Sequence, residues 1–456
     1  MLFANVAAFR ESWRAKLEPA LLDMKILVTA IACSPVFGSE AYVGWSAVRA
    51  LSRNHELWVI INKQGREGVQ AAVTKGEVPA SIHFIYHGRS QEEFDRTFLT
   101  PWHPNRLVAR LSNWLNYLEW NNGLLDLGRK LHAKIGFDLV HHITYATWRV
   151  GSPLVRLGLP FVWGPIGGGE YMPLPFVPIL SAPGAAFEIL RKVSDLVSTF
   201  SRNVRRTARF SSHIFVANKE TESRADRLRG RKMGISRLLQ VFFTEESIAK
   251  FSDDHETKSF EGTLRFFAGG MLEGRKGIAL AIRALFEVRA AGVPFEYAFG
   301  GNGPERRYLA SLAERLGLSS SIHFSDGFYG DAYVTRLRET HVYLMPSLRD
   351  TASITLMEAM LAGCVPIVLD TGGPGEIVNE ECGFKILPLS PRYVIEQIRK
   401  IIVSIDADRR ILKRLSRAAT DRITQTYSIQ NYLAAIENAY VACVCGNPSE
   451  SRIKRY

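Results

Sequence analysis

The sequence predicts an α/β protein of two doubly wound domains, each with a mainly parallel sheet between layers of helices. Three observations predict this fold. Short apolar runs alternate with helical patterns along most of the chain. The 456 residues exceed what one hydrophobic core usually organises. Glycine-bearing turns follow the apolar runs in both halves, and open α/β sheets bind ligands at such strand ends.

The first domain is expected over residues 24–245, after an N-terminal extension of residues 1–23. The extension carries Arg10 and Glu11 where a signal peptide would need an apolar centre. Buried strands are predicted in five apolar runs of this domain, separated by helical patterns. These runs read KILVTAIA, HELWVII, FDLVHHIT, LPFVWGPI and SHIFVAN.

The second domain is expected over residues 262–425. Residues 246–261 are polar and lack strand patterning, which is typical of an interdomain linker. Residues 426–456 are expected to form a C-terminal helix and tail that can cross back to the first domain. The strands predicted in the second domain read LRFFAGG, FEYAFGG, SIHFSDG, HVYLMPS and VPIVLDTGG.

Composition and charge narrow the classes of partner. The chain carries 46% hydrophobic and 22% charged residues, an ordinary globular composition. Its net charge of +12 favours acidic partners such as nucleic acid, anionic lipid or phosphorylated substrates, and charge alone does not choose among them. No uncharged apolar run reaches the ~20 residues that a membrane-spanning helix needs. A protein that does not span the membrane is therefore expected.

Metal and disulfide chemistry are not expected. The five cysteines show neither a disulfide framework nor paired metal-ligand spacing, which suits a reducing cytoplasm. The triplet Asp406-Ala407-Asp408 precedes a charged helical pattern and is interpreted as a helix cap. We therefore predict no metal and no cofactor.

The stretch RDTASITLMEAMLAG, residues 349–363, carries the most specific chemistry. Apolar spacing predicts a helix that begins near Ser353, so Asp350 lies in the preceding loop and Glu358 lies inside the helix. The N–H groups of a helix N-terminus suit phosphate, and carboxylates accept hydrogen bonds from sugar hydroxyls. A nucleoside-diphosphate sugar would meet all three groups. The alternative is that Asp350 only caps the helix and Glu358 pairs with a surface base.

Several blocks of the second half resemble the retaining glycosyltransferases of family 4, which have the GT-B fold. These blocks are FAGGMLEGRKGIALAIRAL, AFGGNGPERRYL, IHFSDGF and the run from HVYLMPS to GGPGEIV, within residues 262–385. The first half resembles the family more loosely, through GSEAYVGW, FDLVHHITYATWRVGSP and PFVWGPIGGGE. The resemblance implies transfer of a sugar from a nucleoside-diphosphate sugar to a glycan or lipid-linked acceptor, in polysaccharide or glycoconjugate biosynthesis.

The resemblance also implies roles for individual residues. Glu358 would hold the ribose, and Asp350 would lie near the transferred sugar, where the family usually has glutamate. Arg275 and Lys276 would hold the diphosphate and stabilise charge on the leaving group. The configuration would be retained without a metal or a covalent nucleophile, by attack from the leaving-group side. The donor side is also expected to include Ser353, Ile354, Thr355, Gly38, Gly269, Gly270 and Gly301.

The first domain would contribute the acceptor side. The candidates are Ser39, Glu40, Gly167, Gly168 and Gly169, with His141 lining the cleft near the transferred sugar. Strand alternation sends His141 and His142 to opposite faces, so at most one of them is functional. Each candidate also has a purely structural alternative. The histidine would make its hydrogen bonds within the protein, the three glycines would only shape a turn, and Arg275 and Lys276 would form a solvent-exposed helix start.

Residues 187–210 combine apolar residues at helical spacing with six basic residues. They are expected either to lie on an anionic bilayer or to form a packed helix with a basic outer face. The expected location is the cytoplasm, with a peripheral position at the inner face of the membrane as an option. The other functions considered are a non-enzymatic GT-B subunit and a nucleic-acid-binding protein, although the chain has no recognisable nucleic-acid module.

Overall fold

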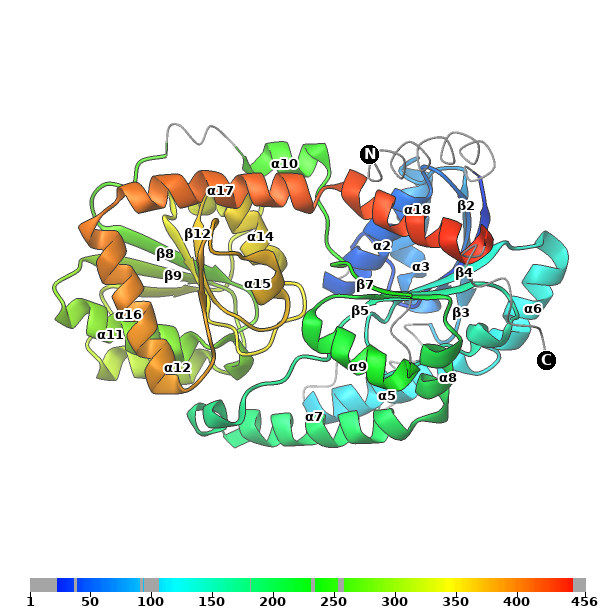
Figure 1. Cartoon of the computed structure of the whole chain (residues 1–456), viewed down its shortest axis with the longest axis horizontal. Coiled ribbons are helices and arrows are strands. Elements are labelled where there is room, and N and C mark those ends of the chain that lie inside the picture. Colours follow the sequence, from blue (N-terminus) through cyan, green and yellow to red (C-terminus); the bar gives the residue numbers. More distant parts are fainter. Residues whose placement is uncertain are drawn as a thin grey trace, which may run out of the picture.

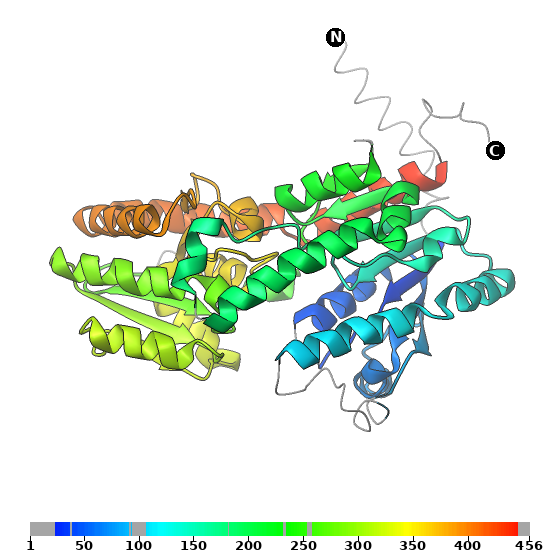
Figure 2. The ribbon, with the colours of Figure 1, turned by 90° about the horizontal axis from the view of Figure 1, so that it is seen from below.

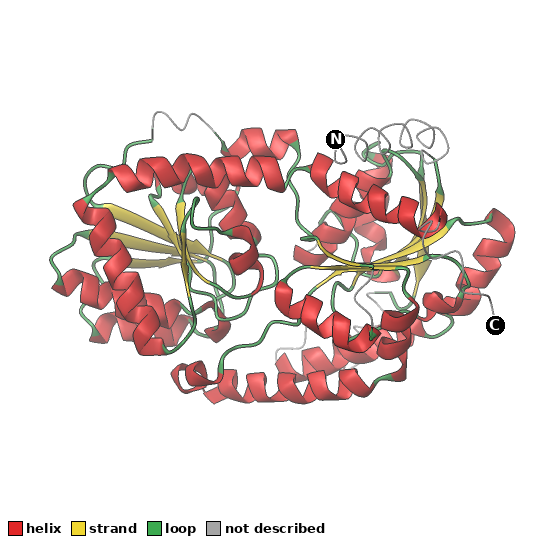
Figure 3. Cartoon of the chain, in the orientation of Figure 1, coloured by secondary structure: helices red, strands yellow, loops and turns green. Residues whose placement is uncertain are grey.

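The computed structural model of the chain describes residues 23–36, 39–90, 93, 106–180, 182–230, 234–252 and 258–445. Gly38 and residues 1–22 of the N-terminal extension lie outside the described residues. The described residues form two α/β domains that lie side by side (Figures 1 and 3). No helix in these ranges is both long enough and apolar enough to cross a membrane.

The N-terminal domain is built on a sheet of seven described strands in the order β3-β2-β1-β4-β5-β6-β7, all of them parallel. Side chains alternate between its two faces, so Ile26 and Val28 join one core cluster and Leu27 joins the other. The strands are β1 (Lys25–Ala30), β2 (Glu56–Asn62), β3 (Ile82–His87), β4 (Leu139–Thr144), β5 (Phe161–Ile166), β6 (His213–Val216) and β7 (Ile235–Arg237).

Helices cover both faces of this sheet (Figure 1). The core that contains Leu27 also holds Leu124, Val204 and Ala225 from the helices of one face. Buried residues on both faces explain why the central strands read as continuous apolar runs. The helices are α2 (Ser39–Leu51), α3 (Arg66–Thr74), α5 (Arg106–Asn121), α6 (Leu124–Ile135), α8 (Arg202–Phe210) and α9 (Lys219–Arg229).

The C-terminal domain has a second parallel sheet, with six described strands in the order β10-β9-β8-β11-β12-β13. Its strands are β8 (Leu264–Gly269), β9 (Phe295–Gly300), β10 (Ile322–Ser325), β11 (Val342–Leu344), β12 (Val365–Leu369) and β13 (Phe384–Ile386). Its helices are α11 (Ile278–Ala290), α12 (Arg306–Arg315), α13 (Gly330–Glu339), α14 (Ile354–Leu361), α15 (Gly372–Ile377), α16 (Pro391–Ala407) and α17 (Arg410–Thr426).

Two segments join the domains on the side where α10 and α17 lie in Figure 1. Helix α10 (Glu245–Phe251) falls in the expected linker, so this linker begins as a helix, and Phe251 is buried in the core of the C-terminal domain. Helix α18 (Ile429–Cys445) follows α17 and packs against the N-terminal domain. There Tyr440 contacts His141, and Glu437 bonds to His55.

A third segment leaves the N-terminal domain and returns to it. After Gly169 the chain reaches the other domain, where Phe176 of the 3-10 turn η3 (Leu174–Ile179) is buried in the C-terminal core. Helix α7 (Ala182–Phe200) then leads back to α8. Figure 1 shows α7 running below both domains, and Figure 2 shows it crossing the middle of the molecule.

The loops at the carboxyl ends of the strands meet between the domains. Thr351, beyond β11, donates a hydrogen bond of 2.7 Å to Glu170, beyond β5. Lys219, beyond β6, pairs with Asp370, beyond β12, at 3.1 Å. The two sheets therefore present the same kind of edge to each other, the edge at which open α/β sheets bind ligands.

Candidate donor site

The centre of the candidate site is the loop between β11 and the N-terminus of α14. Ser353 occupies the N-cap position in the left-handed conformation, with φ 53°, and its side chain makes no capping bond. The first turn of α14 therefore begins abruptly, after a loop that carries Asp350. Ile354 and Thr355 form that turn, as expected. Such a helix start directs N–H groups and a partial positive charge away from the helix.

Asp350 lies beside two cations of the loop after β8. Nζ of Lys276 is 2.6 Å from Oδ2 of Asp350, and a guanidinium nitrogen of Arg275 is 3.6 Å from Oδ1. Burial alone would raise the pKa of Asp350, but the charges of Lys276 and Arg275 outweigh it and hold this pKa below its usual value. The carboxylate is therefore ionised at neutral pH and accepts a hydrogen bond from the side chain of Lys276.

Glu358 lies on α14, and Tyr333 of α13 donates a hydrogen bond of 2.7 Å to its Oε2 atom. Burial raises the pKa of Glu358 to about 7, although the bond from Tyr333 works in the opposite direction. Glu358 therefore does not form the surface ion pair of the alternative interpretation. Tyr333 was missed from the sequence, because nothing in its spacing links α13 to a carboxylate on α14.

The glycine turns after β8 and β9 lie together next to α14. The N–H of Gly270 donates to the carbonyl of Gly300 at 2.9 Å, and Gly301 has φ 145°. A Cβ on Gly301 would lie 2.0 Å from the carbonyl oxygen of Gly270, so only glycine fits there. The hydroxyl of Thr355 donates to the carbonyl of Gly269 at 3.3 Å. The structure thus brings these glycines together with the start of α14.

The glycines of the N-terminal domain are packed against protein atoms. A Cβ on Gly167 would lie 2.1 Å from Cγ2 of Thr351, and one on Gly169 would lie 2.5 Å from Cα of Thr221. Gly168 has φ 86°, and its carbonyl accepts a bond of 2.8 Å from Arg149. These contacts favour the alternative of a structural turn. The turn nevertheless touches the donor loop through Thr351.

Glu40 and Ser39 begin helix α2. An oxygen of Glu40 accepts a hydrogen bond of 2.8 Å from the N–H of Ala146, beyond β4. Burial raises the pKa of Glu40, and the bond from Ala146 opposes this rise. The side chain of Ser39 lies outside the described residues. Glu40 therefore joins two loops at the carboxyl edge of the first sheet.

Glu170 is a contact between the domains that was missed from the sequence. Its side chain is 1% exposed, and its Oε1 atom accepts the bond from Thr351. Its Oε2 atom accepts bonds from the N–H of Gly168 at 3.1 Å and from Asn218 at 3.2 Å. Its position directly after three consecutive glycines could have marked Glu170 as a candidate in the sequence. Glu170 fixes the position of the loop that carries Asp350.

The structure does not support the expected cleft position of His141. Its Nε2 donates to the carbonyl of Gly164 at 2.7 Å, and its Nδ1 accepts from the hydroxyl of Tyr440 at 2.6 Å. Burial lowers the pKa of His141 to about 4, so the ring stays neutral. Both ring nitrogens are thus engaged within the protein, because helix α18 covers this face of the sheet. His142 is also buried, and its Nδ1 lies 2.7 Å from the hydroxyl of Thr29.

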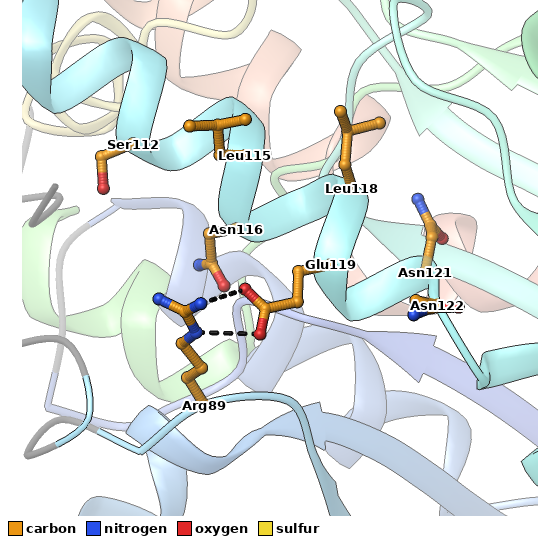
Figure 4. Close-up of a pocket in the computed structure, with 8 residues that line it drawn as sticks. All are labelled: Arg89, Ser112, Leu115, Asn116, Leu118, Glu119, Asn121 and Asn122. Carbon is orange, nitrogen blue, oxygen red and sulfur yellow. Dashed lines mark hydrogen bonds and ion pairs between the residues drawn. The ribbon is translucent and has the colours of Figure 1, made fainter. Parts of the chain in front are cut away.

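A hollow of about 710 Å³ lies in the N-terminal domain beside helix α5 (Figure 4). Arg89, just beyond β3, pairs with Glu119 of α5 at 2.9 Å across it. Asn116 is 4% exposed, and its amide nitrogen has no hydrogen-bond partner among the described residues. Amides and a charged pair beside the exposed Leu115 and Leu118 suit a polar ligand with apolar faces. These residues were not predicted from the sequence.

Within the described ranges, no group of three or more histidine, cysteine, aspartate or glutamate side chains is arranged to hold a metal ion. Asp408 follows α16, and its carboxylate accepts from the N–H of Arg410 at 3.1 Å. Asp408 lies one residue before Arg409, the N-cap of α17, so this bond is next to the cap position and not at it.

Comparison with known proteins identifies the domain that holds this site. Residues 250–420 match the family described as glycosyl transferases group 1. An uncharacterized glycosyltransferase of Methanocaldococcus jannaschii is 26% identical over 172 residues, which cover 38% of this chain and 43% of the relative. The 2-deoxystreptamine glucosyltransferase of Streptomyces kanamyceticus is 26% identical over 180 residues, which cover 39% of this chain and 45% of the relative. The chain thus spans less than half the length of these curated relatives.

Solved structures show the same fold over most of the chain. Anabaena Alr3699/HepE, solved in complex with UDP, aligns with a TM-score of 0.59 at 15% identity. The alignment covers 91% of this chain and 99% of the Anabaena chain. The chain therefore has the GT-B architecture of two Rossmann-like domains, and its residues 250–420 match the family model of the group 1 glycosyl transferases.

Proposed function

We propose that the chain is a retaining glycosyltransferase that moves a sugar from a nucleoside-diphosphate sugar to a glycan or a lipid-linked acceptor. One observation carries the proposal. The N-terminus of α14 lies between an ionised carboxylate held by Lys276 and Arg275 and a second, half-buried carboxyl group at Glu358. The match of residues 250–420 to the family model of the group 1 glycosyl transferases supports it. The UDP complex of the Anabaena structure supports a nucleoside diphosphate as the leaving group.

Each part of the donor has a matching group in this site. The ribose hydroxyls would donate to Glu358, and the diphosphate would face the start of α14 together with Lys276 and Arg275. The transferred sugar would lie beside Asp350. Gly269, Gly270 and Gly301 would let the backbone approach the donor closely, because no side chain intervenes.

The reaction breaks the bond between the anomeric carbon and the diphosphate oxygen. The acceptor hydroxyl forms the new bond on the same face, and its proton passes to the departing diphosphate. Negative charge on the diphosphate is greatest in the transition state, where Lys276 and Arg275 stabilise it. The protein also orients the two substrates. In this proposal the step needs neither a covalent nucleophile nor a metal.

The acceptor is proposed to enter from the N-terminal domain. The hollow beside α5 lies near the carboxyl end of β3. The carboxyl ends of the strands in this sheet form the edge that faces the C-terminal domain, which holds the donor site. Arg89, Asn116 and Glu119 would bond to hydroxyl or phosphate groups of this acceptor. The product would belong to a polysaccharide or another glycoconjugate. A nucleic-acid partner has no support from the site.

A thermal-shift screen over nucleoside-diphosphate sugars tests the proposal. At least one such sugar should raise the melting temperature of the wild type, because ligands that bind only the folded state stabilise it. Glu358→Gln should lose most of this rise, whereas the control Glu287→Gln, a partly exposed residue on α11, should keep it. The purified protein should also hydrolyse the best donor slowly. Stabilisation without any turnover of the donor would favour a non-enzymatic GT-B subunit, and no stabilisation by any donor would overturn the proposal.

A further inference from the structure

The side of helix α7 that packs on the rest of the chain carries polar and charged side chains. Glu188 accepts a bond of 2.8 Å from Arg349, and Asp195 pairs with Arg149 at 2.5 Å. Arg191 donates to the carbonyl of Gly168 at 2.8 Å. Glu188 and Asp195 are 7% and 3% exposed. The inner face of this helix is therefore a row of buried ion pairs and hydrogen bonds.

The outer face of α7 is apolar. Val193, Leu196, Val197 and Phe200 are 53 to 64% exposed and are close together on one helix, which makes them an exposed apolar patch. Steps of three and four residues place them on one side of the helix, opposite Asp195. Ile189 and Leu190 extend the same face toward the start of α7, and Phe210 of α8 is exposed beyond its end. We call these seven residues the α7 outer face.

This arrangement reverses the usual orientation of an amphipathic helix, whose apolar side packs on the core. It also corrects one expectation from the sequence, that of a packed helix with a basic outer face. The apolar residues recognised there point outward, because α7 packs on a surface rich in arginine rather than on apolar side chains.

Within residues 184–210, the exposed charged side chains are all positive. Glu188 and Asp195 are the only acidic residues in 184–210, and both are buried in ion pairs. Lys192 of α7 is exposed, as are Arg202, Arg206 and Arg209 of α8. An apolar strip with only cations beside it in this segment is complementary to an anionic lipid surface.

We propose that the α7 outer face docks on an anionic membrane. The helix of 19 residues is about 28 Å long and would lie flat in the interface. Its apolar side chains would enter the boundary between headgroups and acyl chains, while Lys192 and the arginines of α8 would contact lipid phosphates. A protein partner explains the apolar strip but gives no reason why residues 184–210 expose no acidic side chain.

The α7 outer face lies where membrane docking would help the proposed sugar transfer. The inner side of α7 holds Arg349, the residue before Asp350, and the carbonyl of Gly168. A membrane under α7 would therefore bring a lipid-linked substrate to the side of the molecule on which the donor loop is anchored. The docking itself does not depend on sugar transfer, because no residue of the α7 outer face belongs to the donor site.

Co-sedimentation with phospholipid vesicles tests the docking. The wild type should bind vesicles that contain phosphatidylglycerol and bind pure phosphatidylcholine vesicles at least tenfold more weakly. Leu196→Glu combined with Phe200→Glu should weaken binding to the anionic vesicles at least tenfold. Phe286→Glu on α11 is the matched control, since Phe286 is exposed on the other domain, and it should bind as the wild type does.

The cationic part of the surface has its own test. Replacing Arg202, Arg206 and Arg209 together by Gln should weaken binding by about fivefold per residue at low salt, and by less in high salt. Lys413→Gln with Arg414→Gln on α17, which is exposed on another side of the molecule, is the control and should leave binding unchanged. Loss of binding in this control to the same extent would show that net charge, and not this surface, attracts the protein.

Three results would overturn the docking proposal. The first is no binding of the wild type to anionic vesicles. The second is equal binding by the wild type and the Leu196→Glu, Phe200→Glu variant. The third is a concentration-dependent dimer of the wild type that this variant abolishes, because the face would then be covered by a second copy of the chain. Glu358→Gln should bind vesicles as the wild type does, which separates a failure of the docking from a failure of the donor site.

Discussion

Replacing Glu358 by Gln should remove a pH dependence of donor binding. Only the ionised carboxyl accepts hydrogen bonds from two ribose hydroxyls, and burial raises its pKa to about 7. In the wild type, the affinity for a nucleoside-diphosphate sugar should therefore rise with pH through about 7 and then level off. Glu358→Gln should bind more weakly at pH 8 and show no such rise.

The size of the effect follows from this pKa. With a pKa near 7, about a tenth of the carboxyl is ionised at pH 6 and about nine tenths at pH 8, so the dissociation constant should fall about tenfold between them. A hydrogen bond to a charged group contributes about 1.5–3 kcal/mol, so at pH 8 the variant should bind about 10- to 150-fold more weakly. Tyr333→Phe removes the bond that lowers the pKa of Glu358, so the midpoint should move to higher pH.

Glu358 also makes the stability of the folded protein depend on pH. The pKa of Glu358 in the folded protein lies above its ordinary value of 4.5, so its contribution to stability is fully present below about pH 4.5 and is lost as the pH rises through about 7. This difference corresponds to at most about 3 kcal/mol. Glu358→Gln should therefore gain stability relative to the wild type between pH 5 and pH 8, as measured by melting temperature without ligand.

Isothermal titration calorimetry between pH 6 and pH 8 is the appropriate assay. The ligand should be a nucleoside-diphosphate sugar and not the free diphosphate, because a terminal phosphate itself titrates near pH 6. An affinity of the wild type that is independent of pH would refute the reasoning. So would the same pH profile in Glu358→Gln, because the titrating group would then lie elsewhere.

Three further predictions concern the rest of the site. Lys276→Ala should lower turnover at saturating donor about 10²- to 10³-fold, measured as release of nucleoside diphosphate, and an unchanged rate would exclude a role at the leaving group. Asp350→Asn should weaken calorimetric binding of the sugar donor far more than binding of the free nucleoside diphosphate, whereas Asp350→Glu should keep substantial activity; equal losses for both ligands would remove Asp350 from the sugar subsite. Gly167→Ala should impair turnover, because its Cβ would clash with Cγ2 of Thr351. Adding Thr351→Ser should restore turnover, since serine lacks that methyl group but keeps the hydroxyl that bonds to Glu170. If turnover is not restored, the clash is not the cause.

The central strands could be predicted from the sequence, and some edge strands could not. Strands such as β1 and β8 are almost fully buried and read as continuous apolar runs. The strands β3, β7 and β13 lie at sheet edges and were missed. β3 is mostly half-buried, and β7 and β13 have three residues each, so neither composition nor length marks them clearly.

The donor site was predictable only in part, for a similar reason. Asp350 and Lys276 are 74 residues apart, and the family resemblance, not their spacing, brought them together. The bond from Tyr333 to Glu358 and the contact of Glu170 with Thr351 depend on how helices and domains pack, which the local pattern does not encode. Helical spacing in α7 was visible in the sequence, but which side faces the protein depends on the arginines against which it packs.

A crystal structure of the chain with the nucleoside-diphosphate sugar that stabilises it most would decide whether Glu358, Lys276 and Asp350 hold the donor. In this structure the ribose hydroxyls should bond to Glu358, and the diphosphate should lie between the start of α14 and Lys276. The sugar should lie within hydrogen-bonding distance of Asp350. The proposed donor site would be wrong if the donor were bound elsewhere, for instance in the hollow beside Arg89 and Asn116, or if its diphosphate made no contact with Lys276 or α14.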